Sequence, residues 1–244
     1  MASNAGIAPF LSNPFDGGAS STSDTAALYR QRLASAQLYL CTDSRKGKGD
    51  FADFVDAAYR GGVDIIQLRD KNIEAAEELA CLDVLRAAAQ RHGKLFSAND
   101  RADIALLSGA HVLHVGQDDV SLPAARHLMG PHPVIGLSTH TPAQVDAAMT
   151  IDELDYFCAG PVWATPTKPG RAAAGLELVQ YAAARTTETG SQRAWFAIGG
   201  IDHTTIGHVI EAGARRVVVV RAITEANDPC SAAESLKSAL PPLS

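Results

Sequence analysis

The chain has 244 residues, of which 46% are hydrophobic, so it is long enough to bury a substantial core. Its formal net charge is −6, it has no run of lysine and arginine, and only 6% of its residues are aromatic, which argues against a nucleic-acid-binding protein. No apolar run reaches the roughly 18 residues needed to span a bilayer. We therefore expect a globular protein with small-molecule partners, anionic ones included, and with neither nucleic acid nor membrane as partner.

The N-terminal segment is rich in Ser, Gly, Ala and Asn and lacks the basic and apolar regions of a secretory signal. We expect residues 1–35 to be a disordered or loosely attached arm, followed by a single catalytic domain at 36–244. The cysteines show no CxxC spacing and favour buried, reduced thiols, which suits a cytoplasmic protein. The sequence is also compatible with a homo-oligomer.

From residue 37 onward, short β-type runs alternate with alanine-rich amphipathic segments in eight units. The expected strands cover residues 37–42, 63–69, 95–99, 111–115, 133–138, 155–160, 194–200 and 216–222. The expected helices cover residues 50–60, 73–93, 102–109, 121–130, 142–150, 176–185, 204–214 and 228–240.

Strands that are apolar nearly throughout, each followed by one helix, indicate a parallel sheet covered by helices. Eight such units predict an α/β fold, the (β/α)₈ TIM barrel. The alternative is a doubly wound open sheet, which would favour a G-x-G-x-x-G motif after its first strand. The chain has no such motif there. In a barrel, functional residues are expected just after the strands, at the C-terminal mouth.

Polar residues follow several of these strands. Alternation places Gln67, Arg69 and Lys71 on one side of the second strand's end, where they are expected to face a ligand. After the fifth strand, Ser138 and His140 could face the same mouth, and His140 is the weaker candidate because a lone histidine is more often structural or solvated. His114 lies inside the fourth strand, and we expect it to be a packed, hydrogen-bonded residue.

Carboxylates follow the third and fourth strands. Asn99 and Asp100 end the third run, and Asp118 and Asp119 follow the fourth. Carboxylates on neighbouring loops suit Mg²⁺, which prefers oxygen ligands and borrows others from water and substrate phosphates. The alternative is that Asp100 and Asp119 cap the next helices. Their spacing alone does not decide between these interpretations.

The loop at residues 160–171 follows the sixth strand and carries three prolines. Thr165, Thr167 and Lys168 share its tip, where hydroxyls can donate to phosphate oxygens and an ammonium can neutralise them. A solvated surface loop is the alternative. Lys168 and Arg171 of this loop are expected to converge with Arg69, Lys71 and the carboxylates of the other loops at the same end of the barrel. That arrangement favours a diphosphate held through a divalent ion.

Two glycines follow the seventh strand. Gly199 and Gly200 would let backbone N–H groups approach an anion closely, at a place in the barrel where phosphate sites recur.

The chain resembles thiamine phosphate synthase, also called thiamine-phosphate pyrophosphorylase, over roughly residues 36–238. The resemblance rests on motifs in the family's order: LYLCTD, QLRDK, ANDRADIA, HVGQDD, GLSTHT, GPVWATPTK, AIGGI and RAIT. It implies a (β/α)₈ transferase of thiamine biosynthesis. Such an enzyme joins 4-amino-5-hydroxymethyl-2-methylpyrimidine diphosphate to 4-methyl-5-(2-phosphoethyl)thiazole in an Mg²⁺-dependent, dissociative substitution that releases thiamine phosphate and pyrophosphate.

The resemblance also implies roles for individual residues. The pyrimidine diphosphate site would contain Gln67, Arg69, Lys71, Asn99, Ser138 and Lys168. The thiazole phosphate site would contain Thr165, Thr167, Gly200, Val220 and Arg221. Asp100 and Asp119 would hold Mg²⁺, whereas Asp118 stands where members often have Glu. Arg69, Lys71 and Lys168 would be catalytic, by stabilising the departing pyrophosphate. Arg221 stands where members commonly have Ser, which leaves open whether a hydroxyl is needed there.

Two other functions stay open from the sequence. Thiazole tautomerases share much of this framework but isomerise their substrate without a diphosphate, so they do not need the full set of cations and Mg²⁺ ligands. A catalytically silent barrel that binds thiamine precursors would use the same binding groups, because a fold does not dictate a function.

Overall fold

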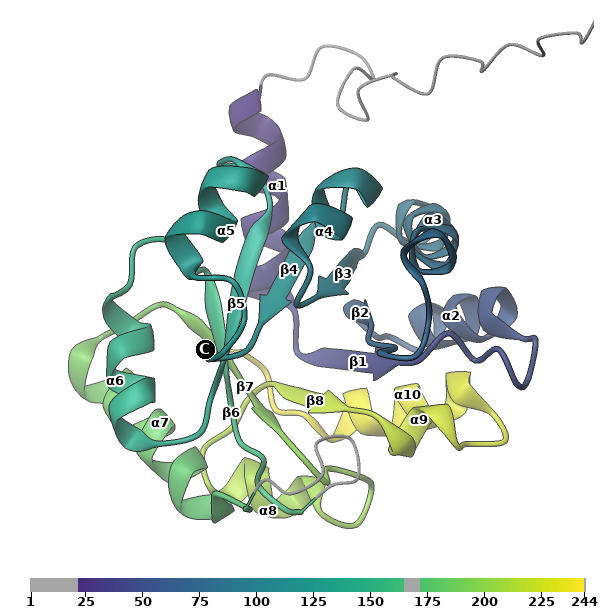
Figure 1. Ribbon diagram of the computed structural model, residues 1–244. Helices are drawn as coiled ribbons and strands as arrows, with labels where there is room; N and C mark the ends of the chain where they lie inside the picture. The colour runs from purple at the N-terminus through teal and green to yellow at the C-terminus, as the bar shows by residue number, and fades with distance from the viewer. Residues whose placement is uncertain (1–21, 165–171, 244) are drawn as a thin grey trace, which may run out of the picture.

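Eight parallel strands close into a barrel in the computed structural model, which describes residues 22–164 and 172–243 (Figure 1). Each strand pairs with the next along the chain, and β8 pairs back to β1. The strands are β1 (Leu38–Thr42), β2 (Ile65–Leu68), β3 (Leu95–Asn99), β4 (Val112–Val115), β5 (Val134–Thr139), β6 (Tyr156–Ala159), β7 (Ala194–Ile198) and β8 (Val217–Val219). The closed order confirms the predicted (β/α)₈ barrel and excludes the open doubly wound sheet.

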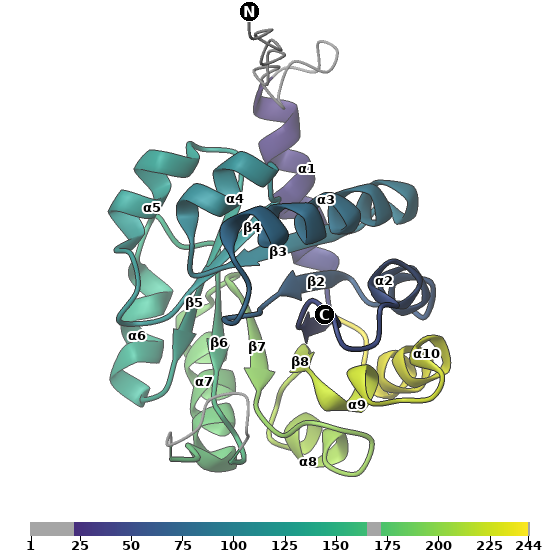
Figure 2. The ribbon, with the colours of Figure 1, turned by 45° about the vertical axis from the view of Figure 1, so that its right-hand side comes forward.

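A ring of helices surrounds the barrel, as Figures 1 and 2 show from two directions. The helices that follow the strands are α2 (Phe51–Arg60), α3 (Ala75–His92), α4 (Ala102–Ser108), α5 (Leu122–Met129), α6 (Pro142–Thr150), α7 (Gly175–Thr189), α8 (Ile206–Glu211), α9 (Arg221–Thr224) and α10 (Pro229–Ala239). Side chains on the outer faces of the strands and inner faces of the helices form one large apolar core. The apolar strands seen in the sequence are therefore buried on both faces, as a parallel sheet requires.

A second, smaller core fills the barrel itself. Tyr39 of β1 and Tyr156 of β6 meet there, with ring centroids 6.1 Å apart, and Phe196 of β7 packs edge-on against both rings. Gly136 of β5 makes room for this arrangement, because a Cβ at this position would lie 2.0 Å from the Tyr156 ring. These rings and their neighbours fill the interior of the barrel.

Helix α1 (Thr22–Ser35) differs from the loosely attached arm expected at residues 1–35. Its Tyr29 ring lies 4.5 Å from that of His111, Arg30 forms a 2.9 Å ion pair with Asp155, and Leu33 is buried in the inner core. These contacts attach α1 to the barrel, beside β3 and β5 (Figure 2). Tertiary contacts, rather than a strong apolar periodicity in the sequence, hold it there.

Two helix starts match the capping signals in the sequence. Thr141 caps α6 by accepting a hydrogen bond from the Gln144 N–H, and Asp228 caps α10 in the same way, each followed by proline in the first turn. Within the described ranges, no helix is both long enough and apolar enough to cross a membrane.

Candidate active site

A cavity of about 280 Å³ opens at the C-terminal mouth of the barrel. Its wall combines strand ends with the loops after β6, β7 and β8. Seven residues predicted for the site line it: Gln67, Arg69, Asn99, Ser138, Gly200, Val220 and Arg221. A second cavity of about 480 Å³ adjoins it and is lined mainly by the loops after β1 and β2. The two cavities share Cys41, Arg69, Val220 and Glu225. The mouth therefore offers two neighbouring compartments.

The end of β2 holds its polar residues by hydrogen bonds to the neighbouring strands. The Gln67 amide donates to Asn99 Oδ1 on β3 at 3.3 Å, while Gln67 Oε1 accepts from the Cys41 thiol on β1 at 2.9 Å. Gln67 is only 2% exposed and still lines the cavity. The alternation of the strand thus predicted its direction correctly, and these bonds fix its amide in the cavity wall.

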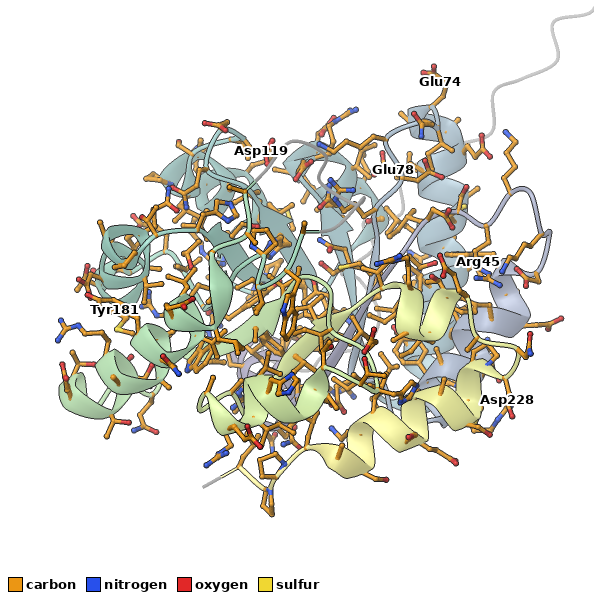
Figure 3. The ribbon with its side chains drawn as sticks, turned by 90° about the horizontal axis from the view of Figure 1, so that it is seen from below. Arg45, Glu74, Glu78, Asp119, Tyr181 and Asp228 are labelled. Carbon is orange, nitrogen blue, oxygen red and sulfur yellow. The ribbon has the colours of Figure 1, made fainter. Side chains whose placement is uncertain are left out.

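Lys71, Asp100 and Asp119 come together on the loops beside this wall. The Lys71 ammonium lies 2.9 Å from Asp100 Oδ2, and the Asp100 and Asp119 carboxyl groups share a hydrogen bond. Asp100 directly follows Asn99 of the cavity wall and has a positive φ of 60°, a backbone conformation uncommon outside glycine. Asp119, labelled in Figure 3, lies on the loop between β4 and α5, where its Oδ2 accepts the Gly116 N–H at 2.7 Å.

The neighbouring charges shift the pKa values of the two carboxyl groups in opposite directions. Burial raises the pKa of Asp100, but the hydrogen bonds from Lys71 and Asp119 and the charges of Lys71 and Arg69 outweigh it and hold this pKa below its usual value. Burial raises the pKa of Asp119, and the adjacent Asp100 carboxylate raises it further, although the Gly116 N–H opposes this. Two carboxylates that resist ionising together form a place where a cation would be favourable.

Neither carboxylate caps the helix that follows it. Residue Arg101 occupies the N-cap of α4 and Ser121 that of α5, and neither helix has a side-chain cap. The capping alternative for Asp100 and Asp119 is therefore excluded, and both carboxylates are available at the barrel mouth.

The donor set fits Mg²⁺ rather than a metal that needs a complete protein cage. Among residues 22–164 and 172–243, no three His, Cys, Asp or Glu side chains gather closely enough to hold a metal ion. Mg²⁺ is commonly bound through one or two carboxylates and completes its coordination with water and substrate phosphates. Asp100 and Asp119 could supply that pair.

The loops after β7 and β8 bring backbone to the opposite wall of the cavity. Gly200 has a φ of +70°, and a Cβ there would lie 2.9 Å from Trp163 Cβ, so packing alone requires glycine. Val220 precedes α9, and Arg221 begins this helix, whereas the sequence predicted a strand through residue 222. The strand is shorter because the pairing of β8 with β1 ends at Val219.

Two histidines also line the cavity: His140, which the sequence indicated as a weaker candidate for the mouth, and His114, which it did not place there. The ring of His114 contacts Ser138 Oγ at 2.9 Å through Nε2, and His140 Nδ1 lies 2.5 Å from the Gly160 carbonyl oxygen. The prediction that His114 is buried and hydrogen-bonded is confirmed, but its place in the cavity wall was not foreseen. His114 lies two residues after Val112 and therefore on the same face of the strand. This alternation was the signal that could have placed His114 on the inner side of the barrel.

Four predicted residues, Thr165, Thr167, Lys168 and Arg171, lie outside the described residues. The structure thus brings together Lys71, Asp100 and Asp119 next to the cavity, and their expected meeting with Lys168 stays a prediction.

Comparison with known proteins identifies the family to which this barrel belongs. The family model described as thiamine monophosphate synthase matches residues 38–223. The chain belongs to this family. It is 62% identical over 226 residues to a thiamine-phosphate synthase of Arthrobacter sp. (strain FB24), covering 85% of this chain and 95% of that protein. It is 59% identical over 217 residues to a thiamine-phosphate synthase of Mycobacterium sp. (strain KMS), with 85% and 94% covered.

A solved structure supports the same family relation. The thiamine phosphate pyrophosphorylase of Pyrococcus furiosus superposes with a TM-score of 0.73 at 27% identity, covering 85% of this chain and 96% of that one. The family resemblance stated from the motifs is therefore confirmed by sequence and by fold.

Proposed function

We propose that this chain joins 4-amino-5-hydroxymethyl-2-methylpyrimidine diphosphate to 4-methyl-5-(2-phosphoethyl)thiazole, releasing thiamine phosphate and pyrophosphate. The observation that carries this proposal is the cluster of Lys71, Asp100 and Asp119 beside the cavity at the barrel mouth, in a member of the thiamine monophosphate synthase family. Two adjoining cavities also suit a reaction with two substrates.

The cations of the mouth would stabilise the leaving group. Lys71 and Arg69 would donate to the diphosphate and neutralise the charge that builds as its bond to the methylene carbon breaks. Lys168 is proposed for the same role from the family resemblance. Asp100 and Asp119 would hold Mg²⁺, which supplies additional stabilisation of charge on the diphosphate when bound.

The substrates themselves supply the rest of the chemistry. The electron-rich aminopyrimidine stabilises a cationic methylene carbon, and the thiazole nitrogen then attacks that carbon, so no protein nucleophile is required. Gln67, Asn99 and Ser138 would orient the pyrimidine diphosphate. Gly200, Val220 and Arg221, with Thr165 and Thr167, would receive the thiazole phosphate. A cytoplasmic location remains a prediction from the sequence.

The test measures pyrophosphate release and identifies thiamine phosphate by mass spectrometry. We expect both products only when both substrates and Mg²⁺ are present, with loss of activity in EDTA and recovery on adding excess Mg²⁺. Isomerisation of a thiazole carboxylate phosphate without pyrophosphate release would instead indicate a tautomerase. Binding of thiazole phosphate with no turnover under any condition would indicate a silent binding protein.

A further inference from the structure

The loop between β4 and α5 folds back on its own first residue. Asp119 Oδ2 accepts the Gly116 N–H at 2.7 Å, so this carboxylate lies over the point where the chain leaves β4. A Cβ at residue 116 would lie 2.9 Å from the same Oδ2 and would push the carboxylate away. The place of the Asp119 carboxylate is therefore set by the segment that follows β4.

The side chain of Gln117 attaches that segment to β5. The last residue of β4 is Val115, which pairs with Leu137 of β5. Two residues later, Gln117 Nε2 donates to the backbone carbonyl oxygen of Ser138 at 2.6 Å. A carbonyl oxygen only accepts hydrogen bonds, so the amide must turn its NH₂ group toward it. The Gln117 side chain thus extends the attachment of β4 to β5 one residue beyond the last strand pair.

This attachment joins the carboxylate pair to the wall of the cavity. Ser138 lines the cavity, while Asp119 shares a hydrogen bond with Asp100, which pairs with Lys71. Mg²⁺ demands near-ideal octahedral geometry, so a small displacement of one carboxylate weakens its binding. A bond that fixes the loop of Asp119 against β5 therefore bears on the metal.

We propose that Gln117 is a positioning residue for the metal site: its hydrogen bond to the Ser138 carbonyl holds the 116–119 loop where Asp119 can share a cation with Asp100. This inference rests on the proposed function, which assigns both carboxylates to Mg²⁺. Gln117 acts through Asp119. Residues that orient metal ligands from outside the coordination shell typically contribute 10–100-fold to metal affinity.

The test measures binding of Mn²⁺, which suits the same oxygen ligands as Mg²⁺, to the protein without substrates. The electron paramagnetic resonance signal of free Mn²⁺ gives the Kd. Gln117→Met nearly preserves the length of the side chain and leaves the charge of the site unchanged, so a change in Kd reports geometry. We expect the Kd to rise about tenfold. The melting temperature should stay near that of the wild type, because Gln117 is an exposed residue.

A second variant displaces the same carboxylate by another route. Gly116→Ala leaves the Gln117 amide in place but adds the Cβ that would lie 2.9 Å from Asp119 Oδ2. It should also raise the Kd for Mn²⁺. An unchanged Kd in this variant would show that the metal does not depend on the place of the Asp119 carboxylate, which would overturn the inference.

Gln37→Met is the matched control. The Gln37 amide likewise donates to backbone carbonyls, those of Arg215 and Pro241 at 3.2 and 2.7 Å, but it lies just before β1 at the opposite end of the barrel. Its Kd for Mn²⁺ should equal that of the wild type. An equal rise in Gln37→Met and Gln117→Met, or no rise in folded Gln117→Met, would overturn the positioning role.

The wild type separates this inference from the proposed function. If it binds Mn²⁺ but makes no thiamine phosphate from the two substrates, the proposed function fails, while the Kd values of the variants still decide the role of Gln117. If it binds no Mn²⁺, even with pyrophosphate added, the metal assignment and the positioning role both fail.

Discussion

Replacement of Lys71 by methionine should separate catalysis from stability. Its ammonium pairs with Asp100 at 2.9 Å, but the Lys71 side chain is 61% exposed. Such exposed pairs contribute about 0–1 kcal/mol to folding, which corresponds to a melting shift of no more than about 4 °C for a chain of this size. At the departing diphosphate, in contrast, one well-placed donor is worth roughly 10²–10³-fold in turnover. Lys71→Met should therefore lower kcat/KM by about that factor.

Lys94→Met is the matched control at the opposite end of the barrel. Lys94 pairs with Asp64 at 2.7 Å, and the side chain of Asp64 is only 12% exposed. Asp64 also accepts the backbone N–H groups of Gln37 and Leu38, so it joins the start of β1 to the segment between α2 and β2. Removing one charged hydrogen bond there should cost about 1.5–3 kcal/mol with little effect on turnover.

Thermal denaturation and steady-state kinetics on both variants give the comparison. We expect Lys71→Met to melt near the wild type with a severe loss of turnover. We expect Lys94→Met to melt at a lower temperature with nearly normal turnover. Normal turnover in folded Lys71→Met would refute the role assigned to this lysine. An equal loss of turnover in the two variants would show that kinetics reports general destabilisation.

Three further predictions concern the site and the barrel interior. Asp100→Ala and Lys168→Ala should each reduce pyrophosphate release at least ~10²-fold while circular dichroism spectra stay unchanged; near-normal release in either folded variant would contradict its assigned role. Because the pKa of Asp119 is raised, its ionised form is lost as the pH falls toward that pKa, so the Mg²⁺ concentration for half-maximal activity should rise on acidification; a concentration independent of pH, or one that falls, would argue against Asp119 as a ligand. Gly136→Ala should destabilise the fold by about 1–3 kcal/mol or more, because the added Cβ would lie 2.0 Å from the Tyr156 ring; an unchanged melting temperature would contradict the packing described.

The barrel and the direction of its strand-end residues could be predicted from the sequence because both follow from local periodicity. Apolar runs separated by single helices predicted eight strands, and alternation within 63–69 correctly placed Gln67 and Arg69 in the cavity wall. The same alternation carried past the strand placed Lys71 only approximately. Beyond Leu68 the chain leaves the strand, and Lys71 turns to Asp100 instead of lining the cavity.

Features that depend on distant contacts could not be predicted in this way. Helix α1 is held by pairs such as Arg30 with Asp155, 125 positions apart, so its own residues gave little sign that it packs on the barrel. Ser138 is held by His114, which lies on the neighbouring strand β4, with His114 Nε2 2.9 Å from Ser138 Oγ. The capping alternative for Asp100 and Asp119 could be excluded only once the starts of α4 and α5 were seen.

The central claim is that Asp100, Asp119 and Lys71 meet around a metal-bound diphosphate. Anomalous diffraction from crystals grown with Mn²⁺ and pyrophosphate tests it most directly, because Mn²⁺ can replace Mg²⁺ and reveals its own position. The account predicts an anomalous peak coordinated by both carboxylates and by a pyrophosphate oxygen, with the Lys71 ammonium in contact with the same pyrophosphate. A peak remote from these residues, or pyrophosphate bound elsewhere with no metal between Asp100 and Asp119, would contradict the account.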